Sequence, residues 1–150
     1  MALLKESTSD NNMGGVLPEG ANSPLNFEQL AVGFEFAPAA YYLDSSLVSK
    51  YLKSVGADED AAKYVPPLAI AAYAMAALAK SLALPPGSIH AAQELEFLKL
   101  VPVGTSISYR GRVAQKLSRG KLNMLVIELD ALDQSGEKVL SGKATLILPG

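Results

Sequence analysis

The stretch VPPLAIAAYAMAALAKSLALPPG, residues 65–87, restricts the fold of this chain more than any other. Between Pro67 and Lys80 it has no charged side chain and no polar group except the Tyr73 hydroxyl, so a helix here has no face suited to water. Paired prolines at both ends, together with Lys80, keep the run shorter than the ~20 apolar residues that cross a bilayer. The pattern therefore predicts a helix enclosed by protein, with no membrane contact.

Downstream of this helix, apolar and polar residues alternate, and this periodicity indicates β-strands. Alternation covers residues 91–98, 105–117, 122–132 and 137–148. The apolar faces of these runs carry Leu95, Phe97, Ile107, Tyr109, Val113, Leu117, Leu125, Ile127 and Leu129, whereas Glu94, Glu96 and Lys116 fall on polar faces. The expected fold class is α+β, in which a curved antiparallel sheet wraps around the long apolar helix and buries it on most sides. This is the shape of a hotdog domain.

The turn SRGK, residues 118–121, determines how two of these strands pair. A three-residue loop, Arg119–Lys121, places Arg112 opposite Glu128 and keeps each face uniform. A two-residue loop would pair Arg112 with Ile127 and mix the faces, so the longer loop is expected.

The N-terminal part of the chain divides into a tail and a domain. Residues 1–25 are rich in Ser, Asn, Gly and Pro and lack apolar periodicity, which predicts a flexible tail. The remaining residues, 26–150, are expected to form one hotdog domain. An extended segment through Tyr41 follows Pro38, and a proline there predicts a strand at the edge of the sheet.

A short amphipathic helix is predicted between this edge strand and the central helix. Its apolar residues recur at helical spacing after Asp44 and Ser45, either of which can cap the first turn. Gly56 stands where a left-handed C-terminal residue ends many helices. The polar run ADEDAAKY, residues 57–64, then leads to the central helix.

Composition excludes several classes of function. The 150 residues include 13 basic and 15 acidic side chains, so no net positive field draws the chain to nucleic acid. The absence of cysteine and the single His90 exclude thiolate metal sites and argue against a histidine-rich metal site or a catalytic triad. We expect no metal and no cofactor. Charged residues at Lys5 and Glu6 interrupt any signal-like run, so a cytoplasmic location is expected.

The chain resembles the MaoC-like branch of the hotdog superfamily, which comprises (R)-specific enoyl-thioester hydratases and 3-hydroxyacyl-thioester dehydratases. The resemblance extends from about Phe27 to Pro149 and includes the step Val32-Gly33, the capped helix and the proline-led apolar helix. It is strongest in IHAAQELEFLKLVPVGTSISYRGRV, residues 89–113, which is similar to fatty-acid-synthase-type and mycolic-acid-type dehydratase domains in its H-x-x-Q-E-x-E-F run, followed by Pro102 and Gly104.

This resemblance implies a water-activating Asp and His in the loop before the central helix, with backbone amides at the helix N-terminus polarising the thioester carbonyl. The corresponding run here is DEDAAKYVPP, which offers Asp58 and Asp60 but no histidine. His90 is the remaining candidate. Because Pro66 and Pro67 have no N–H, the amides of Leu68 and Ala69 would have to bind the carbonyl oxygen.

Substrate contacts are expected from basic residues and from the central helix. Lys116, Arg119 and Lys121 could bind the phosphates of coenzyme A or an acidic acyl carrier protein. Tyr73 could line an acyl tunnel, although a core position is the more common role for such a residue. The other two arginines of this region, Arg110 and Arg112, are expected to pair with Asp130 and Glu128 across the sheet.

Three functions are compatible with these residues. The first is a hydratase or dehydratase, a hydro-lyase acting on enoyl or 3-hydroxyacyl thioesters of CoA or acyl carrier protein, working as a dimer that is either a homodimer or a heterodimer with another hotdog subunit. The second is a non-catalytic acyl-chain-binding subunit, paired as a heterodimer with a hotdog that supplies Asp and His. The third is a thioesterase, which is disfavoured because no acidic residue lies between Pro66 and Lys80.

Overall fold

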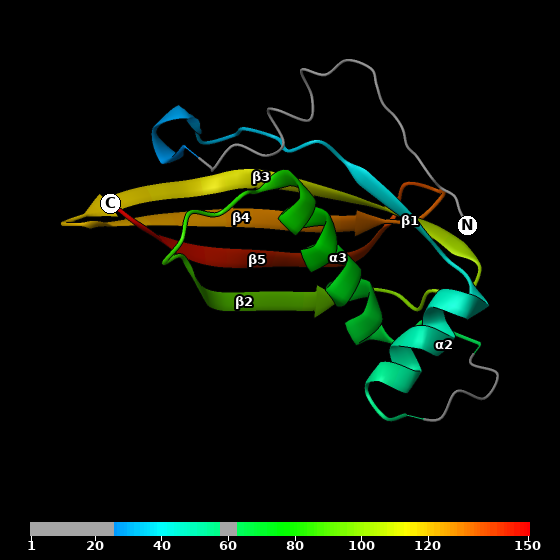
Figure 1. Ribbon diagram of the computed structural model, residues 1–150. Coiled ribbons are helices and arrows are strands. Elements are labelled where there is room, and N and C mark those ends of the chain that lie inside the picture. The colour runs from blue at the N-terminus through cyan, green and yellow to red at the C-terminus, as the bar shows by residue number, and fades with distance from the viewer. Residues whose placement is uncertain (1–25, 58–62) are drawn as a thin grey trace, which may run out of the picture.

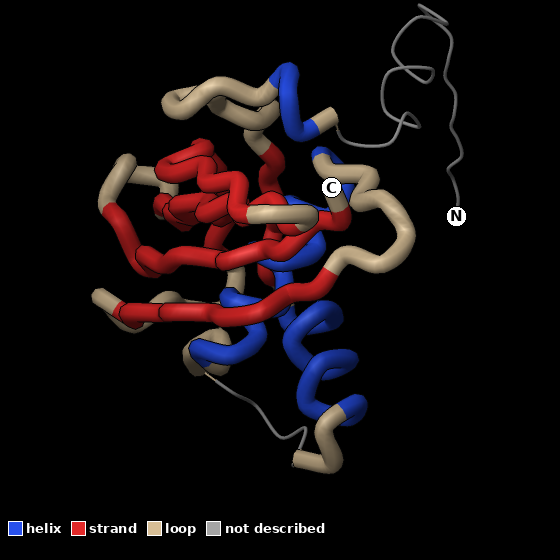
Figure 2. The backbone as a smooth tube through the Cα atoms, turned by 90° about the vertical axis from the view of Figure 1, so that its left-hand side faces the viewer, coloured by secondary structure: helices blue, strands red, loops and turns tan. Residues whose placement is uncertain are grey.

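Five antiparallel strands form one sheet, in the order β1-β3-β4-β5-β2, in a computed structural model that describes residues 26–57 and 63–150 (Figure 1). The strands are β1 (Ala39–Leu43), β2 (Ile89–Phe97), β3 (Thr105–Arg119), β4 (Leu122–Leu132) and β5 (Lys138–Pro149). Figure 2 shows the sheet bending beside α3 (Pro67–Ser81). The predicted α+β architecture is confirmed. The expected tail, residues 1–25, lies outside the described residues.

The short helix between β1 and α3 forms where the sequence predicts it. The Asp44 side chain accepts a hydrogen bond of 2.9 Å from the Leu47 N–H and caps α2 (Ser45–Ser54). Gly56, just beyond the end of α2, has a φ of 74°, a conformation that costs glycine little. A single 3₁₀ turn, η2 (Phe27–Gln29), precedes β1 in the described residues.

One face of α3 packs on the sheet and the opposite face is uncovered. Ala69, Ile70, Ala71, Ala74, Ala77 and Leu78 are buried. On the other side Leu68 is 61% exposed, and Ala72 and Ala76 are exposed as well. The prediction that the sheet buries α3 on most sides is therefore wrong for this chain by itself. The apolar sequence of a helix predicts that its surface is buried. It does not indicate whether the same chain or another chain buries it.

The buried face of α3 contributes to two apolar clusters. Ile70 and Ala74 pack with Leu43, Ile107 and Leu140 near α2, whereas Leu78 packs with residues of the β3–β4 hairpin and β5. The Tyr109 hydroxyl, from β3, donates a hydrogen bond of 3.0 Å to the Ile70 carbonyl. This bond ties the helix to the sheet at the centre of the core.

The β3–β4 register is as predicted, but the loop is not. Arg112 lies opposite Glu128, as expected, while Arg119 pairs with Leu122, so the loop has two residues. A bulge after Val113 absorbs the difference. Because the bulge shifts the alternation by one residue, the predicted sides of Lys116 and Leu117 are reversed.

The two outer strands differ in their surroundings. β1 pairs only with β3 among the described strands and begins just after Pro38, which confirms the predicted edge position. β2 follows α3 in the chain yet pairs with β5, with a register shift between His90 and Ala92. This leaves the full length of β2 as the other edge of the sheet.

Candidate functional site

The N-terminus of α3 is the first candidate site. The Ala69 N–H already donates a hydrogen bond of 2.9 Å to the Pro66 carbonyl, so it is engaged within the turn. The Leu68 N–H donates to no backbone carbonyl among the described residues, and the Leu68 side chain is exposed. Of the two expected amide donors, the Leu68 amide is the one left available. Asp58 and Asp60, the expected carboxylates, lie outside the described residues.

His90 lies at the opposite end of the molecule from this helix terminus. The Val65 N–H donates a 2.7 Å hydrogen bond to the Val101 carbonyl, so α3 begins beyond the C-terminal end of β2. His90 stands near the start of β2, separated from Phe97 by roughly 20 Å of strand. Its ring Nε2 lies 3.0 Å from the Gln93 amide oxygen. The only histidine of the chain therefore does not face the α3 N-terminus of its own chain.

The three expected phosphate-binding residues do not form one cluster. Lys116 is turned toward η2 by the β3 bulge, where its ammonium group donates to the Leu30 carbonyl and lies 4.4 Å from the centre of the Phe27 ring. Arg119 and Lys121 are exposed at the β3–β4 hairpin turn. Since Lys116 is used within the fold, only the two hairpin residues are free for an anionic ligand.

Tyr73 belongs to a group of three tyrosines whose rings contact one another at tilted and edge-to-face angles. Its ring centre lies 5.0 Å from that of Tyr41, which in turn lies 5.7 Å from that of Tyr109. Burial, followed by the nearby Tyr41, raises the pKa of Tyr109 well above its usual range. The space enclosed beside Tyr109, Ala74 and Leu78 is about 10 Å³, too small for an acyl chain. This space between α3 and the sheet therefore does not provide the expected acyl tunnel.

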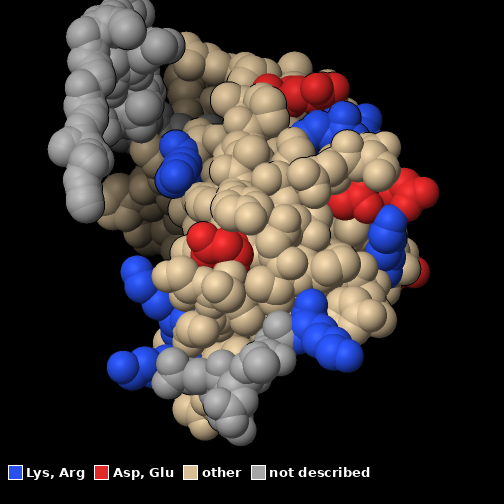
Figure 3. Space-filling model, turned by 90° about the vertical axis from the view of Figure 1, so that its right-hand side faces the viewer, with Lys and Arg blue, Asp and Glu red and all other residues tan. Residues whose placement is uncertain are grey.

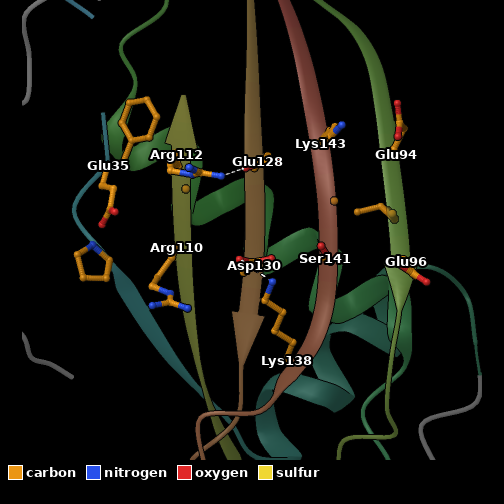
Figure 4. A pocket seen from close by; sticks show the side chains of 15 residues that line it. Glu35, Glu94, Glu96, Arg110, Arg112, Glu128, Asp130, Lys138, Ser141 and Lys143 are labelled. Carbon is orange, nitrogen blue, oxygen red and sulfur yellow. Dashed lines mark hydrogen bonds and ion pairs between the residues drawn. The ribbon is translucent and has the colours of Figure 1, made fainter. Parts of the chain in front are cut away.

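The outer face of the sheet carries a groove of about 680 Å³ that the sequence analysis did not anticipate (Figure 4). Across this face, charged residues of alternating sign stand in one row, one from each neighbouring segment. The row is Glu35, Arg112, Glu128, Lys143 and Glu94. Alternation within each strand predicted a polar face, but only the strand order brings Lys143 next to Glu94.

The charges of this groove neutralise one another. Arg112 forms an ion pair with Glu128, as predicted, whereas Asp130 lies 3.5 Å from the Lys138 ammonium group. The predicted ion pair between Arg110 and Asp130 is not seen among the described residues, although the two residues are opposite in register. Five acidic and four basic residues line the groove, so it offers no excess positive charge to a coenzyme A phosphate.

An apolar surface surrounds the N-terminus of α3. Tyr64 is bridged to Pro102, and Leu68 and Leu100 are 61% and 64% exposed. Phe97 and Leu98, at the end of β2, are exposed as well. Charged side chains lie mainly around the margin of this end of the molecule (Figure 3). Exposed apolar side chains concentrated in this way are typical of interaction sites.

Two classes of site have no counterpart in the described part of the chain. Residues 26–57 and 63–150 contain no group of three potential metal-ligating side chains. No helix in those ranges combines the length and the apolar content that a membrane crossing needs.

Comparisons with solved structures agree with this architecture. A MaoC-like dehydratase of Rhodospirillum rubrum is 25% identical over 83% of this chain and 97% of its own, with a TM-score of 0.69. The chain has the hotdog fold. An (R)-hydratase of Pseudomonas aeruginosa is 20% identical over 82% of this hotdog chain and 84% of its own, with a TM-score of 0.69. The resemblance to MaoC-like proteins seen in the sequence is thus confirmed in the structure.

A third hotdog neighbour is a complex of two different subunits. The 3R-hydroxyacyl-ACP dehydratase complex HadBC of Mycobacterium tuberculosis is 16% identical over 77% of this chain and 96% of its own, with a TM-score of 0.63. No family model and no curated protein sequence matches the chain.

Proposed function

We propose that this hotdog chain is an acyl-thioester-handling subunit that pairs with a second hotdog subunit carrying the catalytic aspartate and histidine. The observation that carries the proposal is the position of His90, the only histidine, roughly 20 Å of strand away from the β2 end beside which α3 begins. MaoC-like chemistry needs a histidine in the loop before the helix, and this chain has none there. Hydration of an enoyl thioester therefore requires a histidine from another chain.

The uncovered face of α3 supports a role in binding the acyl chain. Leu68, Ala72 and Ala76 form an apolar strip with small side chains, which a partner subunit could cover while leaving room for an acyl chain. The Leu68 N–H, at the positive end of the helix dipole, can donate a hydrogen bond to an acceptor such as a thioester carbonyl oxygen. The HadBC complex gives a precedent for a hotdog fold assembled from unlike subunits.

The proposal is tested first by activity of the full chain alone. With trans-2-octenoyl-CoA as the substrate, we expect hydration indistinguishable from buffer, as measured by loss of enoyl absorbance. Hydration by the chain alone, lost in Asp58→Asn or Asp60→Asn, would instead establish a self-sufficient hydratase. Release of free thiol from octanoyl-CoA would establish a thioesterase.

Binding provides the second test. Dodecanoyl-CoA should raise the thermal midpoint, because a ligand that binds only the native state stabilises it. Leu68→Asp should abolish this rise. An acidic residue is favourable in the first turn of a helix, so the substitution should not unfold the protein, and the lost rise then reports lost binding. Val32→Asp is the matched control, since Val32 is 63% exposed in the turn before β1, away from the N-terminus of α3 and from the basic hairpin residues. An equal loss in both variants contradicts a site on α3.

A further inference from the structure

The open edge of β2 carries a charge pattern that bears on the identity of its partner. β2 pairs with β5 on one side, and no described strand pairs with its other side. Its sequence, IHAAQELEF, contains neither proline nor lysine, two residues that commonly protect an edge strand. From Ala92 to Phe97 the pairing with β5 is regular. This part of β2 is therefore able to accept another strand.

The register with β5 assigns the side chains of β2 to two faces. Gln93 and Leu95 pair with Ala144 and Gly142 and lie on the same face as α3. Glu94 and Glu96 lie on the outer face, opposite Lys143 and Ser141. The register shift near Ala91 puts His90 on the side of Gln93, as their 3.0 Å contact confirms. The outer face of β2 is thus purely acidic.

A second copy of this chain would meet like charges along this edge. Two identical edges related by a two-fold axis pair antiparallel, and each face stays on its own side of the joined sheet. In any register of the regular part, Glu94 and Glu96 of both copies fall on one face, directly opposite or diagonal to each other. Directly opposite side chains have Cβ atoms about 5 Å apart, and like charges there are destabilising. Neither copy contributes a cation from β2.

We infer that Glu94 and Glu96 select against self-pairing and favour a different hotdog subunit, one whose facing strand presents Lys or Arg opposite them. The inference rests on the proposed function, because it assumes that this chain pairs with a second hotdog subunit, and it assigns that pairing to the open edge of β2. It adds to that function the chemistry of the partner subunit. The strand of the partner that pairs with β2 should carry basic residues on the outer face. On the face toward α3 the partner should carry apolar residues that cover Leu95, Phe97 and Leu68. Complementary charge of this kind determines which partner binds more than how tightly it binds.

A charge exchange between two forms of the full chain tests this inference. Glu94→Lys/Glu96→Lys and the wild type should each sediment as monomers at micromolar concentration and low salt, and their mixture should form a 1:1 dimer. Added salt should weaken the mixed dimer and strengthen self-association of the wild type, because screening shortens the range of both forces. Glu94→Gln/Glu96→Gln should self-associate at least tenfold more tightly than the wild type.

The matched control makes the same change of charge near the β1 edge of the sheet, far from β2. Glu28→Lys/Glu35→Lys has the same net charge as the exchanged variant, yet its mixture with the wild type should remain monomeric. A wild-type homodimer that the Gln variant does not strengthen overturns the charge selection but leaves pairing through β2 intact. If the wild type, the Gln variant and the mixture all stay monomeric at every salt concentration, β2 is not a pairing strand and the inference fails, whereas the proposed function is still decided by the activity and dodecanoyl-CoA tests.

Discussion

The two edges of this sheet are built differently. At the β1 edge, residues 33–36 and β1 both bond to β3, but Pro38 interrupts the edge between them. α2 begins directly after β1, so the edge ends within five residues. At the other edge, β2 runs for nine residues without proline or lysine. A fold that protects one edge and leaves the longer one open is suited to joining another sheet at the open edge.

The largest expected effect comes from forcing β2 away from β5. A Cβ built on Gly142 lies 2.4 Å from the Glu94 carbonyl oxygen, which is backbone and cannot turn aside. We expect Gly142→Ala to lower the free energy of unfolding by about 1–3 kcal/mol in urea titrations, the usual cost of overpacking. It should also weaken any assembly that uses β2.

A matched glycine near the protected edge should behave in the opposite way. A Cβ on Gly111 has its closest contact at 3.4 Å, to the Phe36 side chain, which is ordinary packing. Gly111→Ala should therefore be neutral or should stabilise the fold by up to about 1 kcal/mol, because alanine restricts the unfolded chain. Equal destabilisation by the two substitutions would show that β2 is not specially sensitive.

The second prediction concerns how the β1 side is anchored to α3. Tyr109→Phe removes the buried hydrogen bond to the Ile70 carbonyl and should cost about 1 kcal/mol in urea unfolding. Tyr42→Phe, at a tyrosine that is 57% exposed on β1, should change the stability by less than about 0.5 kcal/mol. If the two substitutions cost the same, the hydroxyl contact does not anchor the helix.

Tyr109 should also make stability depend on alkaline pH. Its folded pKa is raised, so the unfolded chain loses the Tyr109 proton first as the pH rises above the ordinary value of 10.0. The folded state then becomes relatively less stable, and this loss is absent in Tyr109→Phe. Urea midpoints of the two proteins should therefore converge as the pH rises above 10.0.

Local signals predicted much of this fold. Caps at Asp44 and Gly56, and alternation along β3 and β4, depend on neighbouring residues, so helix limits and the Arg112–Glu128 pair could be read from the sequence. The bulge after Val113 could not, because no glycine or proline marks it. A single inserted residue was enough to direct Lys116 away from the outer face and toward Leu30.

Non-local features of the site escaped prediction for a different reason. The pairing of β2 with β5 is set by closure of the whole sheet, and it decides that Lys143 stands opposite Glu94. The distance between His90 and the start of α3 likewise follows from the direction of β2. The apolar sequence of α3 indicated burial, but residues 26–57 and 63–150 place no atoms over its Leu68 face.

The smallest expected effect tests how the C-terminal end of the open edge is held. Lys99, just beyond β2, donates to the Asp133 carboxylate at 2.8 Å, and Asp133 also accepts from the N–H groups of Ser135 and Glu137. The hydrogen bond from Lys99, followed by that from the Glu137 backbone, lowers the pKa of Asp133. The stabilisation is therefore present above the unfolded value of 3.8 and is lost as the pH falls through the lower folded value.

Asp133→Asn should lower the thermal midpoint slightly at pH 7, and the difference from wild type should vanish in strong acid, whereas Glu28→Gln should show no such convergence. A difference that persists at low pH would mean that the charge of Asp133 does not hold this turn, and that the end of β2 is fixed by other contacts, such as the hydrogen bond from the Leu98 N–H to the Val139 carbonyl.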